Sequence, residues 1–333
     1  MPEVLEKAAR PRLKIGPHTI DVPVIVAPMA GMTDLPFRET AREWGAGYAI
    51  GEMTASHPRL RDTKKSSTRW ADANESGLKV VQLLGADPLI MADAARYAED
   101  SGADVVDINM GCPAKKVLQR ACGSALMKDE ALVAEILREV VKAVQIPVTL
   151  KTRLGWDQDH RNVLRIGEIA QEEGVQCLTI HGRTRDQRFE GEAEYGLIKA
   201  AKAHLSIPVI VNGDIDSPAK ARAVLDYTGA DGVMIGRASY GNPWIFGEIA
   251  RALGYGEARG PITLEERKCT ILKHFDRHIA YYGEGGLRQF RKHLRYYLAP
   301  LGVEPSALND AFALSDADTL RAWIVRVLEE LSS

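Results

Sequence analysis

Short apolar runs alternate with longer amphipathic segments from about residue 22 to residue 250. The runs are rich in Val and Ile, and their near-continuous apolar character is typical of strands buried on both faces of a parallel sheet. Eight such runs occur, at 22–28, 47–53, 79–85, 104–110, 147–152, 177–182, 208–213 and 231–236. The segments between them have the period of amphipathic helices, for example 88–100, 128–144, 162–173 and 217–226.

The starts of several predicted helices carry capping residues, since Asp87, Asp129 and Ser217 stand where an N-cap is expected. Eight strand–helix units predict a TIM (β/α)₈ barrel. An open doubly wound sheet has the same local pattern and is the alternative. The barrel is favoured because the count is eight and because polar residues end nearly every strand. In a barrel those carboxyl ends converge on one site.

The pattern changes after Tyr255. Residues 254–261 are rich in Gly and end in Pro, which indicates a linker. Residues 263–298 and 316–331 then predict helices with no strands between them. The expected organisation is a catalytic barrel over 1–253, a linker over 254–262 and a small all-α helical domain over 263–333.

Composition narrows the classes of protein that fit. The formal net charge of the 333 residues is −2, so any surface for nucleic acid must be local. The first residues are charged throughout, unlike a signal peptide, and no apolar stretch reaches the length of a membrane span. The four cysteines form no C-x-x-C pair, which argues against structural zinc, an iron–sulfur cluster or disulfides. We expect a cytoplasmic, monomeric protein with reduced thiols and no metal.

The last two predicted strands end in a pattern that suits a phosphate. Asn212-Gly213-Asp214 follows the seventh strand and Gly236-Arg237 follows the eighth. In phosphate-binding barrels the loops after these two strands offer backbone N–H groups to the ligand, and an arginine adds a charge-assisted bond. The two motifs together favour a phosphate site over two tight turns.

Other strand ends suit an isoalloxazine ring. Pro28, Met29 and Ala30 follow the first strand, and Gln82 on the third strand both donates and accepts hydrogen bonds, matching the polar edge of a flavin. Lys151 ends the fifth strand, where a cation near flavin N1 and O2 would stabilise the reduced ring. The alternatives for Lys151 are a buried ion pair and a Schiff base.

Cys112 lies in a Gly-Cys-Pro turn just past the fourth strand, so its thiol is expected to face the barrel mouth. A lone cysteine is usually a small buried hydrophobic residue, but this one is in a loop. Reduction of the C=C bond in an enone-like ring needs a hydride on one carbon and a proton on the other. A neutral thiol is a suitable acid at neutral pH. Asn109 is expected to hold the imide edge of the substrate.

Three basic side chains are expected at the same mouth. His181 and Arg183 follow the sixth strand, and Arg153 follows the fifth. Either arginine is a candidate for neutralising charge that develops on the substrate or for holding a backbone phosphate. His181 alone would be taken as a core histidine, but its alignment with Lys151 and Asn212 places it at the cofactor site.

These motifs together resemble the bacterial tRNA-dihydrouridine synthases, and further short stretches of the sequence resemble their B subgroup. The resemblance covers roughly residues 20 to 300. The matching stretches are 27–34 (APMAGMTD), 109–113 (NMGCP), 125–127 (ALM), 151–156 (KTRLGW), 180–185 (IHGRTR), 212–215 (NGDI), 235–237 (IGR) and 242–246 (NPWIF).

The resemblance implies a TIM barrel that reduces the C5=C6 bond of a uridine in the D-loop of tRNA, with NADPH as the source of electrons. It implies that hydride passes from FMN N5 to C6 and that Cys112 delivers the proton to C5. Subgroup resemblance points to position 17. It also implies the residues that hold FMN: Pro28, Met29, Ala30, Gln82, Lys151, His181, Asn212, Gly213, Asp214, Gly236 and Arg237. Cys122 departs from the family pattern, because a small residue such as alanine is expected at this position. A packing role without chemistry is favoured for this residue.

A uridine in folded tRNA reaches a barrel-bottom flavin only when it is flipped out, and the rest of the tRNA must then rest on a basic surface. Between residues 259 and 300, nine Lys or Arg stand against four acidic residues. Arg288, Arg291, Lys292 and Arg295 fall on one face of a predicted helix without an acid among them. They are expected to contact phosphates, although a charge run more often marks an ordinary solvated face.

Three other functions remain open at this point. An FMN barrel that reduces a free enone or pyrimidine would share the phosphate loops and Lys151 but would not need the basic helix. A non-redox aldolase using Lys151 would be colourless. A non-enzymatic RNA-binding protein would not depend on Cys112.

Overall fold

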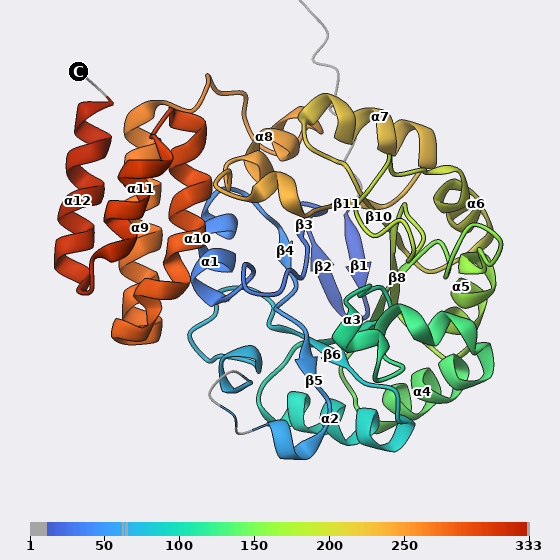
Figure 1. Ribbon diagram of the computed structural model, residues 1–333. Coiled ribbons are helices and arrows are strands. Elements are labelled where there is room, and N and C mark those ends of the chain that lie inside the picture. The colour runs from blue at the N-terminus through green and yellow to red at the C-terminus, as the bar shows by residue number, and fades with distance from the viewer. Residues whose placement is uncertain (1–11, 62, 64–65, 332–333) are drawn as a thin grey trace, which may run out of the picture.

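The computed structural model describes residues 12–61, 63 and 66–331. Its centre is a parallel sheet curled into a barrel, with the strand order β4-β3-β11-β10-β9-β8-β7-β6-β5 (Figure 1). The order begins with β4 (Tyr48–Ala49), β3 (Val24–Val26) and β11 (Gly232–Ile235), and ends with β6 (Val80–Leu84) and β5 (Thr54–Ala55). The strands between them are β10 (Val209–Asn212), β9 (Cys177–His181), β8 (Val148–Arg153) and β7 (Val105–Asn109).

The barrel closes through one short segment of chain. β4 pairs with β3, β5 pairs with β6, and the intervening Gly51 N–H donates to the carbonyl of Val80 at 3.2 Å. β4 lies within the second predicted strand, and β5 follows directly after its predicted end. All eight predicted strands are present, and because the two ends of the sheet meet, the predicted TIM barrel is confirmed and the open doubly wound sheet is wrong.

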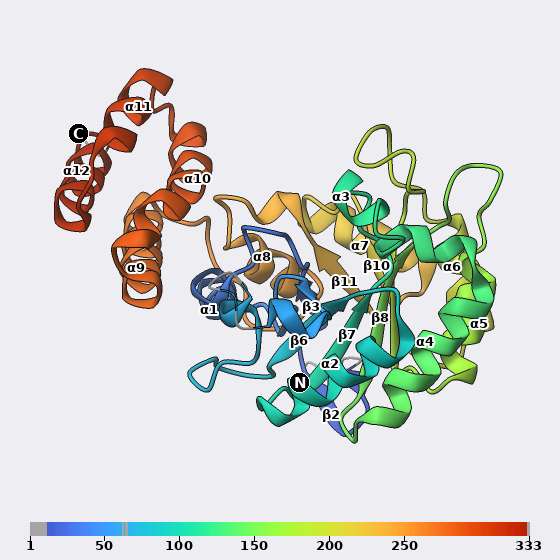
Figure 2. The ribbon, with the colours of Figure 1, turned by 60° about the horizontal axis from the view of Figure 1, so that its bottom comes forward.

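Eight helices of the described chain surround the barrel or lie at its mouth (Figures 1 and 2). They are α1 (Leu35–Glu43), α2 (Pro88–Asp100), α3 (Lys115–Leu118), α4 (Glu130–Ala143), α5 (Val163–Glu172), α6 (Gly196–His204), α7 (Pro218–Thr228) and α8 (Ile245–Ala252). The predicted caps are confirmed, because Asp87, Asp129 and Ser217 each accept a bond from a backbone N–H in the first turn.

An antiparallel hairpin that the apolar pattern did not predict closes the amino-terminal end of the barrel. It consists of β1 (Leu13–Ile15) and β2 (His18–Ile20). Its apolar side chains join one buried cluster with inward residues of the strands, such as Ile25 and Val105. A hairpin of two three-residue strands is too short to give a recognisable alternation, so it leaves little signal in the sequence.

Four helices form a bundle beside the barrel, with a hydrophobic cluster of its own (Figure 1). They are α9 (Leu264–Tyr282), α10 (Gly286–Leu298), α11 (Pro305–Ala313) and α12 (Ala317–Glu330). Residues 254–262 precede them without forming a helix or strand. The segment predicted as helical over 263–298 contains two helices, because Gly283–Gly285 form a short 3₁₀ turn that separates α9 from α10. α11 was not predicted.

The bundle is attached to the barrel through α1, which packs against α9. The indole N–H of Trp44 donates to Thr270 at 3.1 Å, and Glu43 pairs with Lys273 and Arg277. A second contact lies near the barrel mouth, where a Cβ on Gly241 would approach the Tyr296 carbonyl to 2.1 Å. Among the described residues, no helix has the length and apolar character of a membrane span.

Candidate active site

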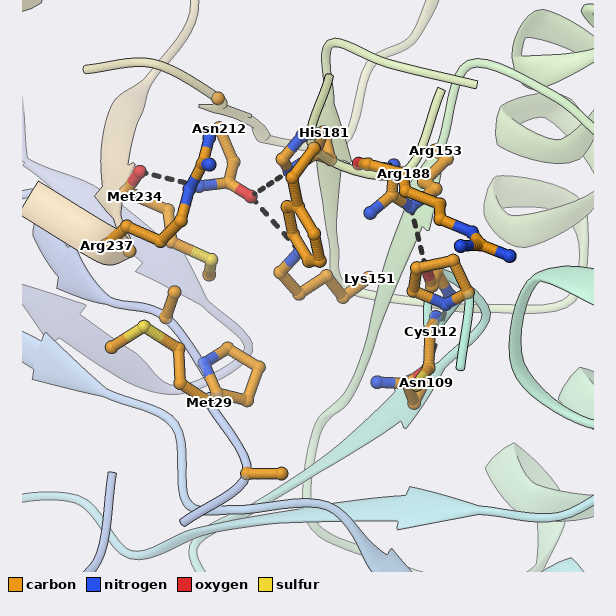
Figure 3. A pocket seen from close by; sticks show the side chains of 18 of the residues that line it. Met29, Asn109, Cys112, Lys151, Arg153, His181, Arg188, Asn212, Met234 and Arg237 are labelled. Atoms are coloured by element: carbon orange, nitrogen blue, oxygen red, sulfur yellow. Dashed lines mark hydrogen bonds between the residues drawn. The ribbon is translucent and has the colours of Figure 1, made fainter. Parts of the chain in front are cut away.

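A cavity of about 880 Å³ opens at the carboxyl ends of the strands (Figure 3). Most of the site residues predicted from the sequence line it: Pro28, Met29, Ala30, Asn109, Cys112, Lys151, Arg153, His181, Asn212, Gly213, Asp214, Gly236 and Arg237. Gln82 and Arg183 lie behind the wall, and the four cations of α10 lie outside the cavity. The structure therefore brings the strand-end residues together, as barrel geometry requires.

The Asn212 amide organises the floor of the cavity. Its Nδ2 donates to the Met234 carbonyl at 2.8 Å, which turns Oδ1 toward Lys151 and His181. That oxygen lies 3.2 Å from Lys151 Nζ and 2.9 Å from His181 Nδ1 (Figure 3). Because Oδ1 only accepts, His181 carries its proton on Nδ1. Burial, with the charges of Arg153 and Lys151, holds the pKa of His181 well below its usual range, so the ring is neutral.

Among the described residues, Lys151 at the cavity wall has no carboxylate as an ion-pair partner. It donates a hydrogen bond to the neutral Asn212 amide, and burial lowers its pKa to about 8. Asp107, on the neighbouring strand, favours the charged form of Lys151, but its carboxylate already accepts hydrogen bonds from Thr149 and Gln82. A buried ammonium that faces a cavity and lacks an ion-pair partner is suited to an anionic or electron-rich group in that cavity.

The loops after β10 and β11 form a cradle of backbone donors. The N–H groups of Gly236 and Arg237 donate no hydrogen bond within the described part of the chain. Gly213 has a φ of 123°, and a Cβ there would approach the Ala193 Cβ to 2.9 Å, so the turn requires glycine. Asp214 adopts a left-handed conformation with a φ of 48°. Unsatisfied N–H groups beside the exposed Arg237 guanidinium are the features of a phosphate site.

Arg183 lies beneath the cradle instead of in the cavity. It is 1% exposed and donates to Asp214 at 2.9 and 2.5 Å and to the carbonyls of Glu190 and Gly191 at 3.0 and 2.6 Å. Its position supports the left-handed turn at Asp214. The expectation that Arg183 contacts substrate directly finds no support in this geometry.

Arg153 lines the cavity and also holds its rim. Nε donates to the Gly111 carbonyl at 2.7 Å, and Nη1 donates to the carbonyls of Thr184 and Arg188 at 3.0 and 2.8 Å. It therefore joins the loop that carries Cys112 to the loop after β9. Burial lowers the pKa of Arg153 to about 10, which leaves it positively charged at neutral pH.

Cys112 lies half-buried on the rim, opposite the cradle (Figure 3). Asn109 Oδ1 accepts its backbone N–H at 3.0 Å, and Ser124 donates to its carbonyl through both N and Oγ. Gly123 has positive φ, and a Cβ there would lie 2.8 Å from the Cys112 oxygen. Burial raises the pKa of the Cys112 thiol, against smaller opposing effects of Arg153 and Lys151. The thiol is therefore neutral and able to donate a proton at neutral pH.

Asn109 and Gln82 form a buried chain of amides under this loop. Asn109 Nδ2 donates to Gln82 Oε1 at 2.9 Å, and Gln82 Nε2 donates to Asp107 at 2.7 Å. Gln82 is 1% exposed, so its amide is occupied within the barrel instead of facing the cavity. Cys122 is also buried, and its thiol donates to the Arg120 carbonyl.

Sequence reasoning missed the residues that the β9–α6 loop brings to the mouth. Phe189 is 51% exposed, and its ring lies between the guanidiniums of Arg153 at 5.4 Å and Arg237 at 5.1 Å. Arg188, on the same loop, also lines the cavity. The only signal for them was an aromatic residue beside a basic one in a polar loop. Met53, Met234 and Tyr240 are further lining residues that no motif indicated.

Helix α10 reaches the same rim. Tyr240, which lines the cavity, lies 4.8 Å from the ring of Tyr296 on α10. A Cβ on Gly31, next to the cavity residue Ala30, would lie 2.8 Å from Lys292 Nζ. The apolar side chains of α10 are buried, and Arg288 and Arg295 are exposed on the other side. The basic face of α10 is thus continuous with the mouth.

Comparisons with known proteins identify the family of the chain. The model of a family described as dihydrouridine synthase (Dus) matches residues 25–321. The tRNA-dihydrouridine synthase B of Xanthomonas axonopodis pv. citri (strain 306) is 54% identical over 286 residues, or 86% of each chain. The tRNA-dihydrouridine synthase B of Salmonella typhimurium is 50% identical over 306 residues, or 92% of this chain and 95% of that one.

Solved structures support the fold at lower identity. The old yellow enzyme homologue from Zymomonas mobilis (NCR) has a TM-score of 0.54 at 15% identity, over 77% of this chain and 95% of that chain. Histamine dehydrogenase from Rhizobium sp. 4-9 has a TM-score of 0.52 at 15% identity, over 80% of this chain and 50% of that chain. At these identities the likenesses show the fold alone. The family match over nearly the whole chain decides the assignment: the chain belongs to the dihydrouridine synthase family.

Proposed function

We propose that this protein is a tRNA-dihydrouridine synthase that reduces the C5=C6 bond of a D-loop uridine. The observation that carries the proposal is the position of Cys112. Its neutral thiol lies on one wall of the cavity, across from the cradle of Gly236 and Arg237 and the ammonium of Lys151. Reduction of an activated double bond needs the proton donor and the hydride donor on opposite faces of the substrate.

FMN fits the residues of the cavity. The unsatisfied N–H groups of Gly236 and Arg237, together with the Arg237 guanidinium, suit its phosphate. The apolar residues Pro28 and Met29 suit one face of its ring, and the size of the cavity falls in the range of cofactor sites. When bound there, FMN supplies hydride chemistry, and NADPH is the proposed source of electrons.

The chain's own groups would hold and tune such a cofactor. Lys151 would place its positive charge at the pole of the ring that gains electrons, and Asn212 would hold Lys151 and the neutral His181 ring in place. Gln82 would act from behind the wall, by holding Asn109. Asp214 would act through Arg237, and Arg183 through Asp214.

Cys112 would donate its thiol proton to the C5 carbon of the uracil, and Arg153 would lower the cost of the negative charge that develops on the base. The half-exposed ring of Phe189, flanked by two guanidiniums, offers a stacking surface for a base at the mouth. Asn109 Oδ1 accepts from the backbone of the Cys112 loop and so holds Cys112, while Nδ2 uses one N–H toward Gln82 and keeps the other for the base.

tRNA would lie over the mouth and the exposed cations of α10, with the target uridine flipped into the cavity. We infer a monomer that acts in the cytoplasm, and by similarity to the B subgroup we infer position 17 as the target. In this arrangement the bundle sets which nucleotide reaches Cys112, since it fixes the tRNA relative to the barrel.

The deciding experiment is to incubate the purified protein with NADPH and either an unmodified tRNA transcript or free uridine. Dihydrouridine is expected at one D-loop position of the transcript, with no turnover of the free nucleoside, because only tRNA contacts both the mouth and α10. Mapping by reverse transcription gives the position. Comparable reduction of free uridine would support the small-molecule reductase instead, and a colourless protein would exclude a flavin.

The basic face of α10 gives a separate prediction. Reversing Arg288 and Arg295 together to Glu is expected to weaken tRNA binding at least tenfold and to lower the slope of log K against log salt by about 2, because two phosphate contacts are lost. These two are chosen because both are exposed, whereas Arg291 donates to the Leu314 carbonyl and Lys292 lies near Gly31. Filter binding over a range of salt concentrations measures both quantities.

A matched control is Arg326→Glu on α12, where the side chain is 65% exposed on the far side of the bundle. It changes the net charge in the same direction but should leave the salt slope unchanged. Equal effects of the control and the double variant would show that only net charge matters, and would remove α10 from the binding surface.

A further inference from the structure

Four buried residues with metal-binding side chains meet between the barrel and the bundle, away from the cavity. Asp34 is the N-cap of α1, His274 and His278 are one turn apart on α9, and His293 is on α10. One ligand atom from each lies within 4.8 Å of the others. The three imidazoles are at most 1% exposed and Asp34 is 5% exposed. Two consecutive helices of the bundle and the start of α1, far away in sequence, therefore bring ligand atoms to one point.

The ring nitrogens that face this point have no hydrogen-bond partner. Within the described residues, His274 Nε2, His278 Nδ1 and His293 Nε2 have no hydrogen-bond partner, while the His278 ring also meets the backbone of Gly286. Asp34 Oδ2 lies 3.4 Å from His278 Nδ1, at the limit of an ion pair. Native proteins rarely leave one buried polar atom unpaired, and three in a single cluster indicate a missing partner.

The surroundings keep the three imidazoles in their neutral form. Burial lowers the pKa of all three histidines, His274 and His293 well below the usual range and His278 to about 3, so each ring is neutral with a lone pair available. Rings of Phe37 and Phe290 pack around them, so the cluster lies in apolar surroundings. His274 Nδ1 lies 2.9 Å from the Tyr297 hydroxyl, and this bond leaves Nε2 pointing into the cluster.

We propose that Asp34, His274, His278 and His293 bind one structural Zn²⁺ ion. Three imidazole nitrogens and one carboxylate oxygen suit zinc, whereas Mg²⁺ and Ca²⁺ prefer oxygen ligands throughout. Four protein ligands complete a tetrahedron and leave no open position, as in structural sites. Ligand atoms at about 2.0–2.1 Å from zinc lie roughly 3.3 Å apart, so the cluster needs only a small contraction.

Lys292 is one of the charges that oppose a cation here. Burial raises the pKa of Asp34 to about 7 and lowers that of His278 to about 3, and the nearby Lys292 charge acts to lower both pKa values. Arg38 and Glu52 also act on Asp34, with opposite signs. The site would therefore bind zinc more tightly once Lys292 is replaced by Gln.

The ion would join α1 of the barrel to α9 and α10 of the bundle. Tyr297 and Lys292 flank His293 on α10, so the helix that borders the cavity mouth would be fixed by a metal bond. The sequence prediction of no metal considered cysteine pairs; the relevant signal was the pair His274 and His278, four residues apart on one face of a helix.

The test measures metal in the full-length protein made without a polyhistidine tag. Mass spectrometry of the metal content is expected to give about one zinc per chain, and removal by a chelator should lower Tm, with recovery when Zn²⁺ is returned. Co²⁺ in place of zinc should give the visible absorption of a four-coordinate ion. None of these readouts depends on FMN, tRNA or turnover, so their failure is distinct from failure of the proposed function.

Variants assign the ligands. Asp34→Asn keeps a capping side chain for α1 but removes the carboxylate, and His278→Ala removes a ligand from α9; each should weaken zinc binding more than about 100-fold, beyond the effect of losing an outer-shell partner. His204→Ala, an exposed histidine on α6, is the control and should keep the zinc. The proposal is overturned if the wild-type protein loaded with Zn²⁺ retains no more metal after dialysis than Asp34→Asn, or if zinc leaves its Tm unchanged.

Discussion

Replacement of Cys112 by alanine is expected to lower the rate of dihydrouridine formation by about 10²–10⁴-fold, the range for loss of a general acid. The thiol lies on the rim opposite the phosphate cradle, and its raised pKa keeps it protonated near neutral pH. Its removal leaves the cradle, Lys151 and Asn212 in place. The variant should therefore stay yellow, and NADPH should reduce it at the wild-type rate. Single-turnover assays of tRNA reduction and stopped-flow measurement of flavin reduction separate the two steps.

Cys122→Ala is the matched control, because this thiol is buried on the adjacent loop and donates to its own loop at the Arg120 carbonyl. It should keep dihydrouridine formation within a few-fold of wild type. If Cys112→Ala forms dihydrouridine at a near-normal rate, another acid protonates C5. If Cys112→Ala loses its flavin, the residue belongs to the cofactor site and its assignment as the proton donor is wrong.

Replacement of Lys151 by methionine is expected to slow flavin reduction by NADPH about 10²–10³-fold, the typical effect of losing one preorganised electrostatic group. Methionine fills a similar volume without the charge. The ammonium is buried, has a pKa of about 8 and is held by the neutral Asn212 amide, so its charge is available to the cofactor. The midpoint potential of the flavin should fall in the variant, and spectroelectrochemistry measures this without tRNA.

Lys142→Met removes an exposed lysine from α4 and serves as the control, with no change expected in rate or potential. An unchanged midpoint potential in Lys151→Met would show that the ammonium lies away from the redox-active part of the cofactor. A covalent adduct trapped by borohydride on Lys151 would support the Schiff-base alternative.

The barrel was predictable because each of its strands is buried on both faces, so its sequence is an apolar run with a polar end. Asn212, His181 and Lys151 stand at such ends, and their convergence follows from the geometry of a closed parallel sheet. The caps at Asp87 and Ser217 were predictable because the bond of an N-cap is local in sequence.

Features that depend on contacts between distant segments were not predictable in the same way. Gln82 and Arg183 have residue types that suit a ligand, but the fold pairs them with Asn109 and Asp214 instead. The β1–β2 hairpin is too short to show a period. The buried histidines are spread over two helices, and their common point with Asp34 exists only once the bundle packs on α1.

The two faces of α10 have different roles, although the helix is only thirteen residues long. His293 and Tyr297 point into the interior, while Arg288 and Arg295 face solvent beside the mouth. An insertion of one residue inside this helix would rotate everything after it by about 100° and displace both sets together. Length variation among relatives should therefore be confined to the turns at Gly283–Gly285 and after Leu298, whereas small changes in the tilt of α10 would re-aim the enzyme at a different nucleotide without altering its chemistry.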